Sequence, residues 1–168
     1  MSSTTSRPKV AIVYGSASDA QTMSKAGATL GRFGVEFEEA VLSAHRAPRT
    51  LADWVDGLRD RGVAVVIAGA GLAAALPGTV AALTTLPVIG VPISGGALDG
   101  MDSLLAIAQM PPGVAVATVG LNNATNAAVL AVQILAVRDP DLAANLATYK
   151  DDFEKAAADG LARAGASA

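Results

Sequence analysis

The chain has 168 residues, of which 52% are hydrophobic and only 4% aromatic, and its formal net charge is −3. This length suits one domain whose core is built from Ala, Val, Leu and Ile, and the negative charge argues against a nucleic-acid partner, which would require a basic surface. The chain has no cysteine and one histidine, His45, so disulfides and thiolate chemistry are excluded and no metal site is expected.

Short apolar runs rich in β-branched residues predict five strands, which alternate with helical patterns. The predicted strands cover residues 9–14, 35–42, 63–68, 86–91 and 114–119. The predicted helices cover residues 19–32, 47–61, 78–84, 101–109 and 122–137. This alternation predicts right-handed crossovers and a parallel sheet with helices on both faces. We therefore expect an α/β fold, a three-layer αβα catalytic domain over residues 8–138.

The two ends of the chain fall outside this domain. Residues 1–7 are polar, lack the apolar stretch of a signal peptide and predict a disordered segment. Residues 139–168 predict an extra C-terminal helix with no strand left to cover, so we expect it to pack on a neighbouring subunit. The apolar stretches are interrupted by Gly, Pro or Thr, which is typical of buried elements. We expect a cytoplasmic protein with no membrane partner.

Polar and glycine-rich segments follow the first three predicted strands. They are Gly15-Ser16-Ala17-Ser18-Asp19, Ser43-Ala44-His45-Arg46 and Gly69-Ala70-Gly71. Ligands of open parallel sheets bind at the carboxyl ends of the strands, so these segments should meet in one crevice. The segment Ser94-Gly95-Gly96 and Asp99 follow the fourth strand and are open to the same interpretation.

Each polar segment is compatible with a ligand site and with a purely structural role. Ser16 and Ser18 at a helix N-terminus suit a phosphate, and Asp19 suits ribose hydroxyls, but the same residues would also cap a helix. Arg46 suits a phosphate and His45 suits proton transfer near neutral pH, although each could be an ordinary surface residue. In one crevice, these groups together favour a nucleotide site.

A series of segments matches one enzyme family in order from about Val10 to Leu135. They are GSASD (15–19), SAHRAP (43–48), AGAG (68–71), LPG (76–78), LPVIGVP (86–92), LDGMDSLLAIAQMP (98–111) and NAAVLAVQIL (126–135). The chain thus resembles class I N5-carboxyaminoimidazole ribonucleotide mutases. This resemblance implies a flavodoxin-like homo-octamer that uses no metal or other cofactor. The family's purine-biosynthesis reaction moves a carboxylate from N5 to C4 of an aminoimidazole ribonucleotide through free CO2.

The resemblance also implies roles for individual residues. His45 would be the catalytic acid and base. The substrate-binding residues would be Ser16, Ser18 and Arg46 at the phosphate, Asp19 at the ribose, and Ser43, Ala70 and Gly71 at the CO2 pocket, with Leu72 beside that pocket.

The chain departs from the family pattern only in binding loops. Leu72 stands where the family has glycine, Ala75 stands where it has histidine, and the loop 120–127 is shorter and richer in asparagine. These departures leave two alternatives to the purine mutase. One is a diverged decarboxylase or carboxylase of a related heterocyclic ribonucleotide in specialised metabolism. The other is a nucleotide-binding protein without catalysis, against which the retained His45 argues.

Overall fold

A computed structural model describes residues 9–165, so the predicted disordered segment 1–7 lies outside the described residues. The strands are β1 (Lys9–Tyr14), β2 (Phe37–Val41), β3 (Val63–Gly71), β4 (Val88–Ile93) and β5 (Ala117–Thr118). They form one parallel sheet in the order β2-β1-β3-β4-β5. This is the strand order of flavodoxin-like folds, and the predicted α/β fold class is confirmed.

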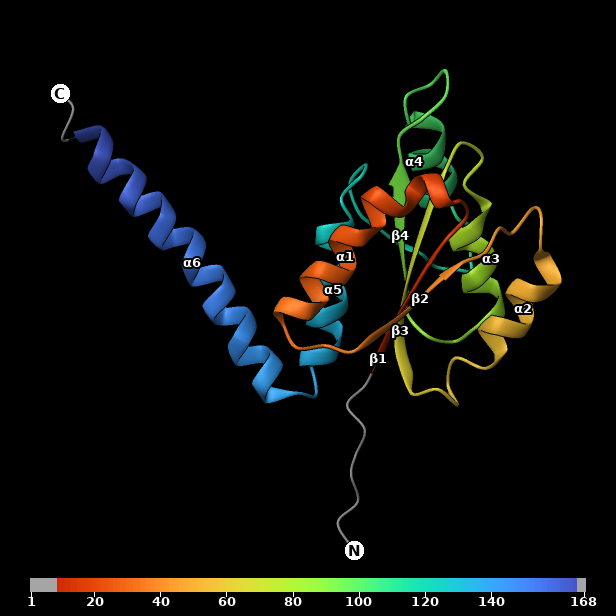
Figure 1. The fold of residues 1–168 in the computed structure, drawn as a ribbon, viewed down its shortest axis with the longest axis horizontal. Coiled ribbons are helices and arrows are strands. Elements are labelled where there is room, and N and C mark those ends of the chain that lie inside the picture. Colours follow the sequence, from red (N-terminus) through yellow and green to blue (C-terminus); the bar gives the residue numbers. More distant parts are fainter. Residues whose placement is uncertain (1–8, 166–168) are drawn as a thin grey trace, which may run out of the picture.

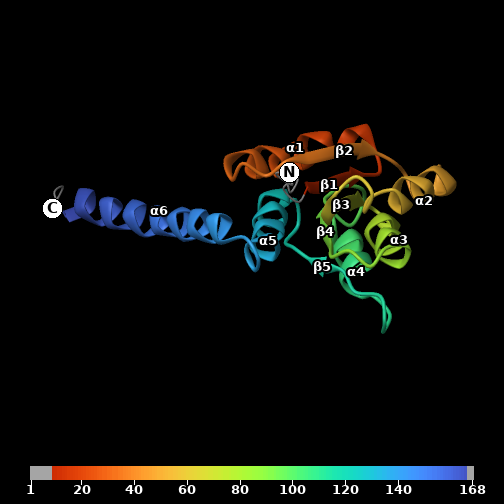
Figure 2. The ribbon, with the colours of Figure 1, turned by 90° about the horizontal axis from the view of Figure 1, so that it is seen from below.

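Helices cover both faces of this sheet (Figures 1 and 2). They are the short 3₁₀ helix η1 (Ala17–Asp19), then α1 (Ala20–Arg32), α2 (Pro48–Asp56), α3 (Ala75–Leu83), α4 (Met101–Ala108), α5 (Ala124–Ala136) and α6 (Pro140–Gly165). Helices α1 and α5 pack on one face, and α2, α3 and α4 pack on the other. The three predicted layers are therefore present.

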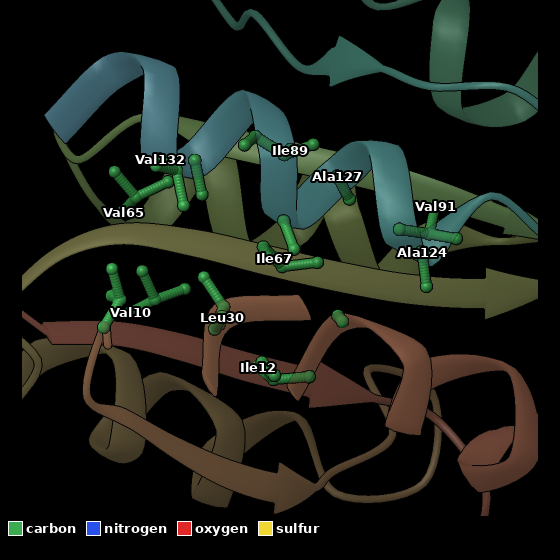
Figure 3. Close-up of a cluster of buried hydrophobic side chains, with 14 of the residues drawn as sticks. Val10, Ile12, Leu30, Val65, Ile67, Ile89, Val91, Ala124, Ala127 and Val132 are labelled. Atoms are coloured by element: carbon green, nitrogen blue, oxygen red, sulfur yellow. The ribbon is translucent and has the colours of Figure 1, made fainter. Parts of the chain in front are cut away.

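The central strands are buried because aliphatic side chains project from both of their faces. On the α1/α5 face, Ile67 of β3 packs beneath helix α5, and Ile12 of β1 lies on the side of helix α1 (Figure 3). Helix α5 presents small residues such as Ala124 and Ala127, which are fully buried. Small side chains bring a helix close to the sheet, and this packing offsets the scarcity of aromatic residues.

On the opposite face, Gly90 of β4 allows α4 to pack closely. A Cβ atom at Gly90 would overlap Cγ2 of Ile107 and lie 2.8 Å from Cγ1 of Val116. We expect Gly90→Ala to lower the free energy of unfolding by about 1–3 kcal/mol, because a packed core cannot take the extra methyl group. Urea unfolding measures the effect, with Gly31→Ala as the matched control, since a Cβ there meets nothing within 4 Å. Equal stability of the two variants would contradict this.

Several boundaries differ from those predicted. Strand β3 continues through Gly71 because its glycines pair with β4 and do not form a turn. Helix α2 ends at Asp56, before Gly57, and does not reach residue 61. Helix α3 begins at Ala75, with Pro77 in its first turn, where proline is tolerated. Strand β5 has only two residues because it pairs only with Ile89 and Gly90 at the sheet edge.

Helix α6 is anchored at its start and then leaves the domain (Figures 1 and 2). Leu142 and Leu146 are buried in the α1/α5 core, and the ring of Tyr149 packs edge-on against Phe33 at 5.2 Å between centroids. Every residue from 150 to 159 is exposed. Of the helices in the described part of the chain, none combines the length and apolarity that a membrane span requires.

Candidate active site

The loops after β1, β2, β3 and β4 surround one pocket of about 510 Å³. It is lined by every residue to which the family resemblance assigns a role, but not by Asp99, which the sequence also offered as a candidate. These lining residues are Ser16, Ser18, Asp19, Ser43, His45, Arg46, Ala70, Gly71 and Leu72. Ala75 and Ser94 also line it. The structure thus brings together residues from four separate loops, and their individual roles stay predictions.

The loop after β1 is held by its own serines. The Ser16 hydroxyl accepts hydrogen bonds from the Ser18 backbone N–H at 3.4 Å and from the Ser18 hydroxyl at 2.9 Å. Ser16 therefore caps the 3₁₀ helix η1 that leads into α1, whereas the Asp19 side chain makes no cap hydrogen bond. The Asp19 carboxylate is thus not used to close the helix and stays available to a ligand.

Burial raises the pKa of the Asp19 carboxyl above its ordinary value, while the Ser18 hydroxyl and the Arg46 guanidinium offset part of this effect. A raised pKa means that the folded protein holds this proton more tightly than the unfolded chain does, so the charged carboxylate destabilises the fold.

We therefore expect Asp19→Asn to raise the melting temperature at neutral pH. The gain should vanish below the ordinary aspartate pKa, where the wild-type carboxyl is protonated in both states. Thermal unfolding followed by circular dichroism across this pH range measures the effect. A gain that does not depend on pH would contradict the assignment of the destabilisation to the Asp19 charge.

The loop after β2 is tied to the loop after β1 through Arg46. The Arg46 Nη2 donates to the Gly15 carbonyl at 2.7 Å, and its backbone N–H donates to the Ser43 hydroxyl at 3.3 Å. The guanidinium is exposed and has further N–H groups for an anion. His45 lies beside it, exposed on the pocket wall. The pocket can therefore supply a fixed positive charge and an imidazole next to each other.

The loop after β3 places Leu72 on the wall of the pocket. Leu72 has a left-handed backbone with φ of 55°, and its side chain is 56% exposed. Its Cδ2 atom would lie 2.6 Å from a Cβ at Gly96, so it contacts the loop after β4. A branched residue in a left-handed conformation is an outlier, and such strain concentrates at functional sites.

We expect Leu72→Gly to be more stable than Leu72→Ala by about 1 kcal/mol, because both remove the side chain but only glycine relieves the left-handed backbone. The free energy of unfolding from urea titration measures the difference. An alanine variant as stable as the glycine variant would show that the backbone at this position is not strained.

The contact between Ser94 and Asn122 was not predicted from the sequence. The Asn122 side chain accepts from the Ser94 backbone N–H at 2.9 Å and donates to the Ser94 hydroxyl at 2.7 Å. From the sequence alone, the asparagine-rich loop 120–127 is only a departure from the family pattern. Within the described residues, no three His, Asp or Glu side chains are grouped as metal ligands would be.

The pocket lies where the strand order reverses, with β1 and β3 side by side at the centre of the sheet. Fold and site together define an α/β protein of the flavodoxin-like class with a small-molecule pocket at the topological switch point. The family model described as AIR carboxylase matches residues 9–156. The chain therefore belongs to the AIR carboxylase family.

Individual relatives agree with this family. An N5-carboxyaminoimidazole ribonucleotide mutase of Pyrococcus abyssi is 51% identical over 148 residues, which cover 88% of this chain and 85% of the relative. A phosphoribosylaminoimidazole carboxylase of Saccharomyces cerevisiae is 55% identical over 133 residues, 79% of this chain but only 23% of that longer protein. The crystal structure of Treponema denticola PurE has a TM-score of 0.84 at 28% identity, covering 91% of this chain and 96% of that one.

Proposed function

We propose that this protein is an enzyme that transfers a carboxylate from N5 to C4 of an aminoimidazole ribonucleotide. The observation that carries the proposal is the convergence of Ser16, Asp19, His45 and Arg46 in one pocket of a chain whose relative over 88% of its length is named N5-carboxyaminoimidazole ribonucleotide mutase. The relative from Saccharomyces cerevisiae is named phosphoribosylaminoimidazole carboxylase, and this name also describes a carboxylation of an aminoimidazole ribonucleotide. The substrate is thus a small ribonucleotide.

In the proposed site, different loops bind different parts of the nucleotide. The hydroxyls of Ser16 and Ser18, at the N-terminal side of α1, and the Arg46 guanidinium bind the phosphate as hydrogen-bond donors. The Ser18 hydroxyl turns its hydrogen from Ser16 to the phosphate when the nucleotide binds. The Asp19 carboxylate accepts from the ribose hydroxyls. Ala70 and Gly71 line the same pocket, and these small residues leave its backbone wall open to CO2.

The proposed chemistry uses one proton carrier. The bond between N5 and the carboxylate carbon breaks, CO2 leaves, and the electron pair stays on N5, which takes a proton from His45. The ring carbon C4 then attacks the retained CO2 and forms a carbon–carbon bond. The proton displaced from C4 returns to His45, so that the imidazole ends in its starting state. The reaction is balanced as an isomerisation, and the CO2 pocket keeps the intermediate from escaping.

The direct test follows the carboxylated aminoimidazole ribonucleotides by ultraviolet absorbance and mass spectrometry in both directions. The proposed function predicts interconversion of the N5-carboxylated and C4-carboxylated isomers, with little free decarboxylated nucleotide. Binding without interconversion would overturn it and would support a nucleotide-binding protein without catalysis.

A diverged decarboxylase or carboxylase is the second candidate, and the contact of Leu72 with Gly96 favours it. This contact narrows the pocket where the family has only glycine, while Ala75 removes a polar side chain from the lining. The combined variant Leu72→Gly/Ala75→His tests this candidate. A large gain in mutase activity from a low wild-type level would support specialisation, whereas high wild-type activity would reject it.

We further propose that the protein works in the cytoplasm as a homo-octamer in which α6 packs on a neighbouring subunit. Two features support self-association. Large apolar side chains are exposed around the start of α4, namely Leu98, Met101 and Leu105, and Phe153 on α6 is 59% exposed. Exposed apolar side chains gathered on one element are typical of interfaces. Light scattering on the purified protein measures the assembly size.

A further inference from the structure

Asn122 has a backbone conformation and contacts that set it apart from its loop. It has a left-handed φ of 57°, a conformation that asparagine tolerates better than most residues. Its backbone N–H donates to the Pro92 carbonyl at 2.8 Å, while its side chain makes both hydrogen bonds to Ser94. Asn122 thus fastens the loop after β5 to the end of β4, although 28 residues separate Asn122 from Ser94.

These contacts fix the orientation of the Asn122 amide by chemistry alone. A backbone N–H can only donate, so the amide oxygen must face the N–H of Ser94. The amide nitrogen then faces the Ser94 hydroxyl, and it can only donate to that oxygen. The Ser94 hydroxyl is therefore an acceptor toward Asn122, and its own hydrogen must point elsewhere. Among the described residues, no hydrogen bond donated by this hydroxyl is found.

Ser94 is one of the residues that line the pocket, whereas Asn122 is not. A ligand in the pocket is therefore a partner to which the free hydrogen of the Ser94 hydroxyl can donate. Ser94 follows Ile93, which pairs with Gly71 in the sheet, so the hydroxyl is close to the segment proposed to hold CO2. An O–H donor directed at this place suits a carboxylate, which accepts hydrogen bonds only.

We propose that Ser94 binds the migrating carboxylate and that Asn122 is the positioning residue that holds its hydroxyl as a donor. This inference rests on the proposed function and adds a specificity residue to it. Ser94 would distinguish the carboxylated nucleotide from the decarboxylated one, because only the carboxylated nucleotide has a carboxylate that can accept a hydrogen bond from the Ser94 hydroxyl.

The experiment compares the affinities of 5-aminoimidazole ribonucleotide and its C4-carboxylated derivative by calorimetry. Ser94→Ala removes the donor. Asn122→Asp still accepts from the Ser94 N–H, but its second oxygen accepts from the hydroxyl and turns that hydrogen away from the pocket. Asn123→Asp is the matched control: it adds the same charge in the same loop, and Asn123 caps α5 by accepting from the Asn126 N–H, which aspartate also does.

We expect Ser94→Ala and Asn122→Asp each to weaken binding of the carboxylated nucleotide by about 10–100-fold, as for a lost hydrogen bond to a charged group. The decarboxylated nucleotide should bind within about twofold of wild type, by the same argument. The control should bind both as wild type does. The double variant Ser94→Ala/Asn122→Asp should be no weaker than Ser94→Ala alone, because Asn122 acts through Ser94.

Three results would overturn the inference: equal losses for both nucleotides, unchanged affinity of Ser94→Ala for the carboxylated one, or additive losses in the double variant. The first would show that the loop has a merely structural role. A wild-type protein that binds neither nucleotide would instead overturn the proposed function itself, so the two failures are distinguishable.

Discussion

Replacing His45 with asparagine is expected to reduce turnover by about 10²–10⁴-fold, the usual contribution of general acid–base catalysis. The reason is that His45 supplies the only imidazole in the chain and lies exposed on the pocket wall between Ser43 and Arg46. Asparagine has a similar size and still forms hydrogen bonds, but it cannot carry a proton between N5 and C4. Initial rates of isomerisation at saturating substrate measure the change.

The affinity of His45→Asn for the nucleotide shows whether the loss of turnover is a loss of catalysis or a loss of binding. Other residues are proposed to bind the phosphate and the ribose, so His45→Asn should bind the nucleotide with an affinity within about threefold of wild type. A change of this size is smaller than the contribution of one hydrogen bond. Calorimetric titration with the product isomer gives this affinity. A parallel loss of binding and turnover would make His45 a binding residue and would leave the reaction without an identified proton carrier.

Arg46→Ala should weaken nucleotide binding by about 10–100-fold, which corresponds to about 1.5–3 kcal/mol for a charge-assisted hydrogen bond. The guanidinium is exposed but already held by the Gly15 carbonyl, and a group fixed in advance loses little entropy when the phosphate binds. Titration at two salt concentrations measures the contribution, because wild-type binding should weaken with salt more steeply than binding by the variant.

Arg49→Ala provides the matched control for charge removal. Arg49 lies three residues further along the chain, is exposed on α2 and does not line the pocket. Equal effects of the two substitutions would mean that only the overall charge matters. Unchanged affinity in Arg46→Ala would remove this residue from the phosphate site. Thermal unfolding of both variants checks that loss of the Gly15 contact has not unfolded the loop.

The centre of the sheet was predictable because β1, β3 and β4 are apolar runs that are buried on both faces. Lys9–Tyr14 of β1 was predicted residue for residue. The prediction is wrong at glycine, since it ends the third strand at residue 68, whereas Gly69 and Gly71 extend β3. A Cβ at Gly69 would overlap the Met23 sulfur, so this glycine is used for close packing of α1. Local sequence does not reveal which partner will approach a glycine.

The residues that line the pocket were predictable where they lie in loops directly after the predicted strands. Loops after parallel strands gather at one edge of the sheet, and so residues as distant in sequence as Ser16 and Leu72 line the same pocket. The bonds between Ser94 and Asn122 depend on how β4 and β5 lie beside each other, which no local pattern contains. By contrast, the cap that Ser16 forms on the 3₁₀ helix is a local contact with Ser18, and the sequence already offered Ser16 as a capping residue.

The backbone amides of helix α6 should differ in their protection from hydrogen exchange, from the buried first turns to the exposed outer ones. Its first turns share the α1/α5 core through Leu142 and Leu146, whereas residues 150–159 touch mainly solvent. In an isolated protomer, amide hydrogens of the outer turns would exchange through local fraying, and those of the inner turns only through larger openings. Docking on a neighbour would slow exchange in the outer turns alone. The rate of deuterium uptake in the outer turns would therefore measure the fraction of protomers that are assembled, without any assay of catalysis.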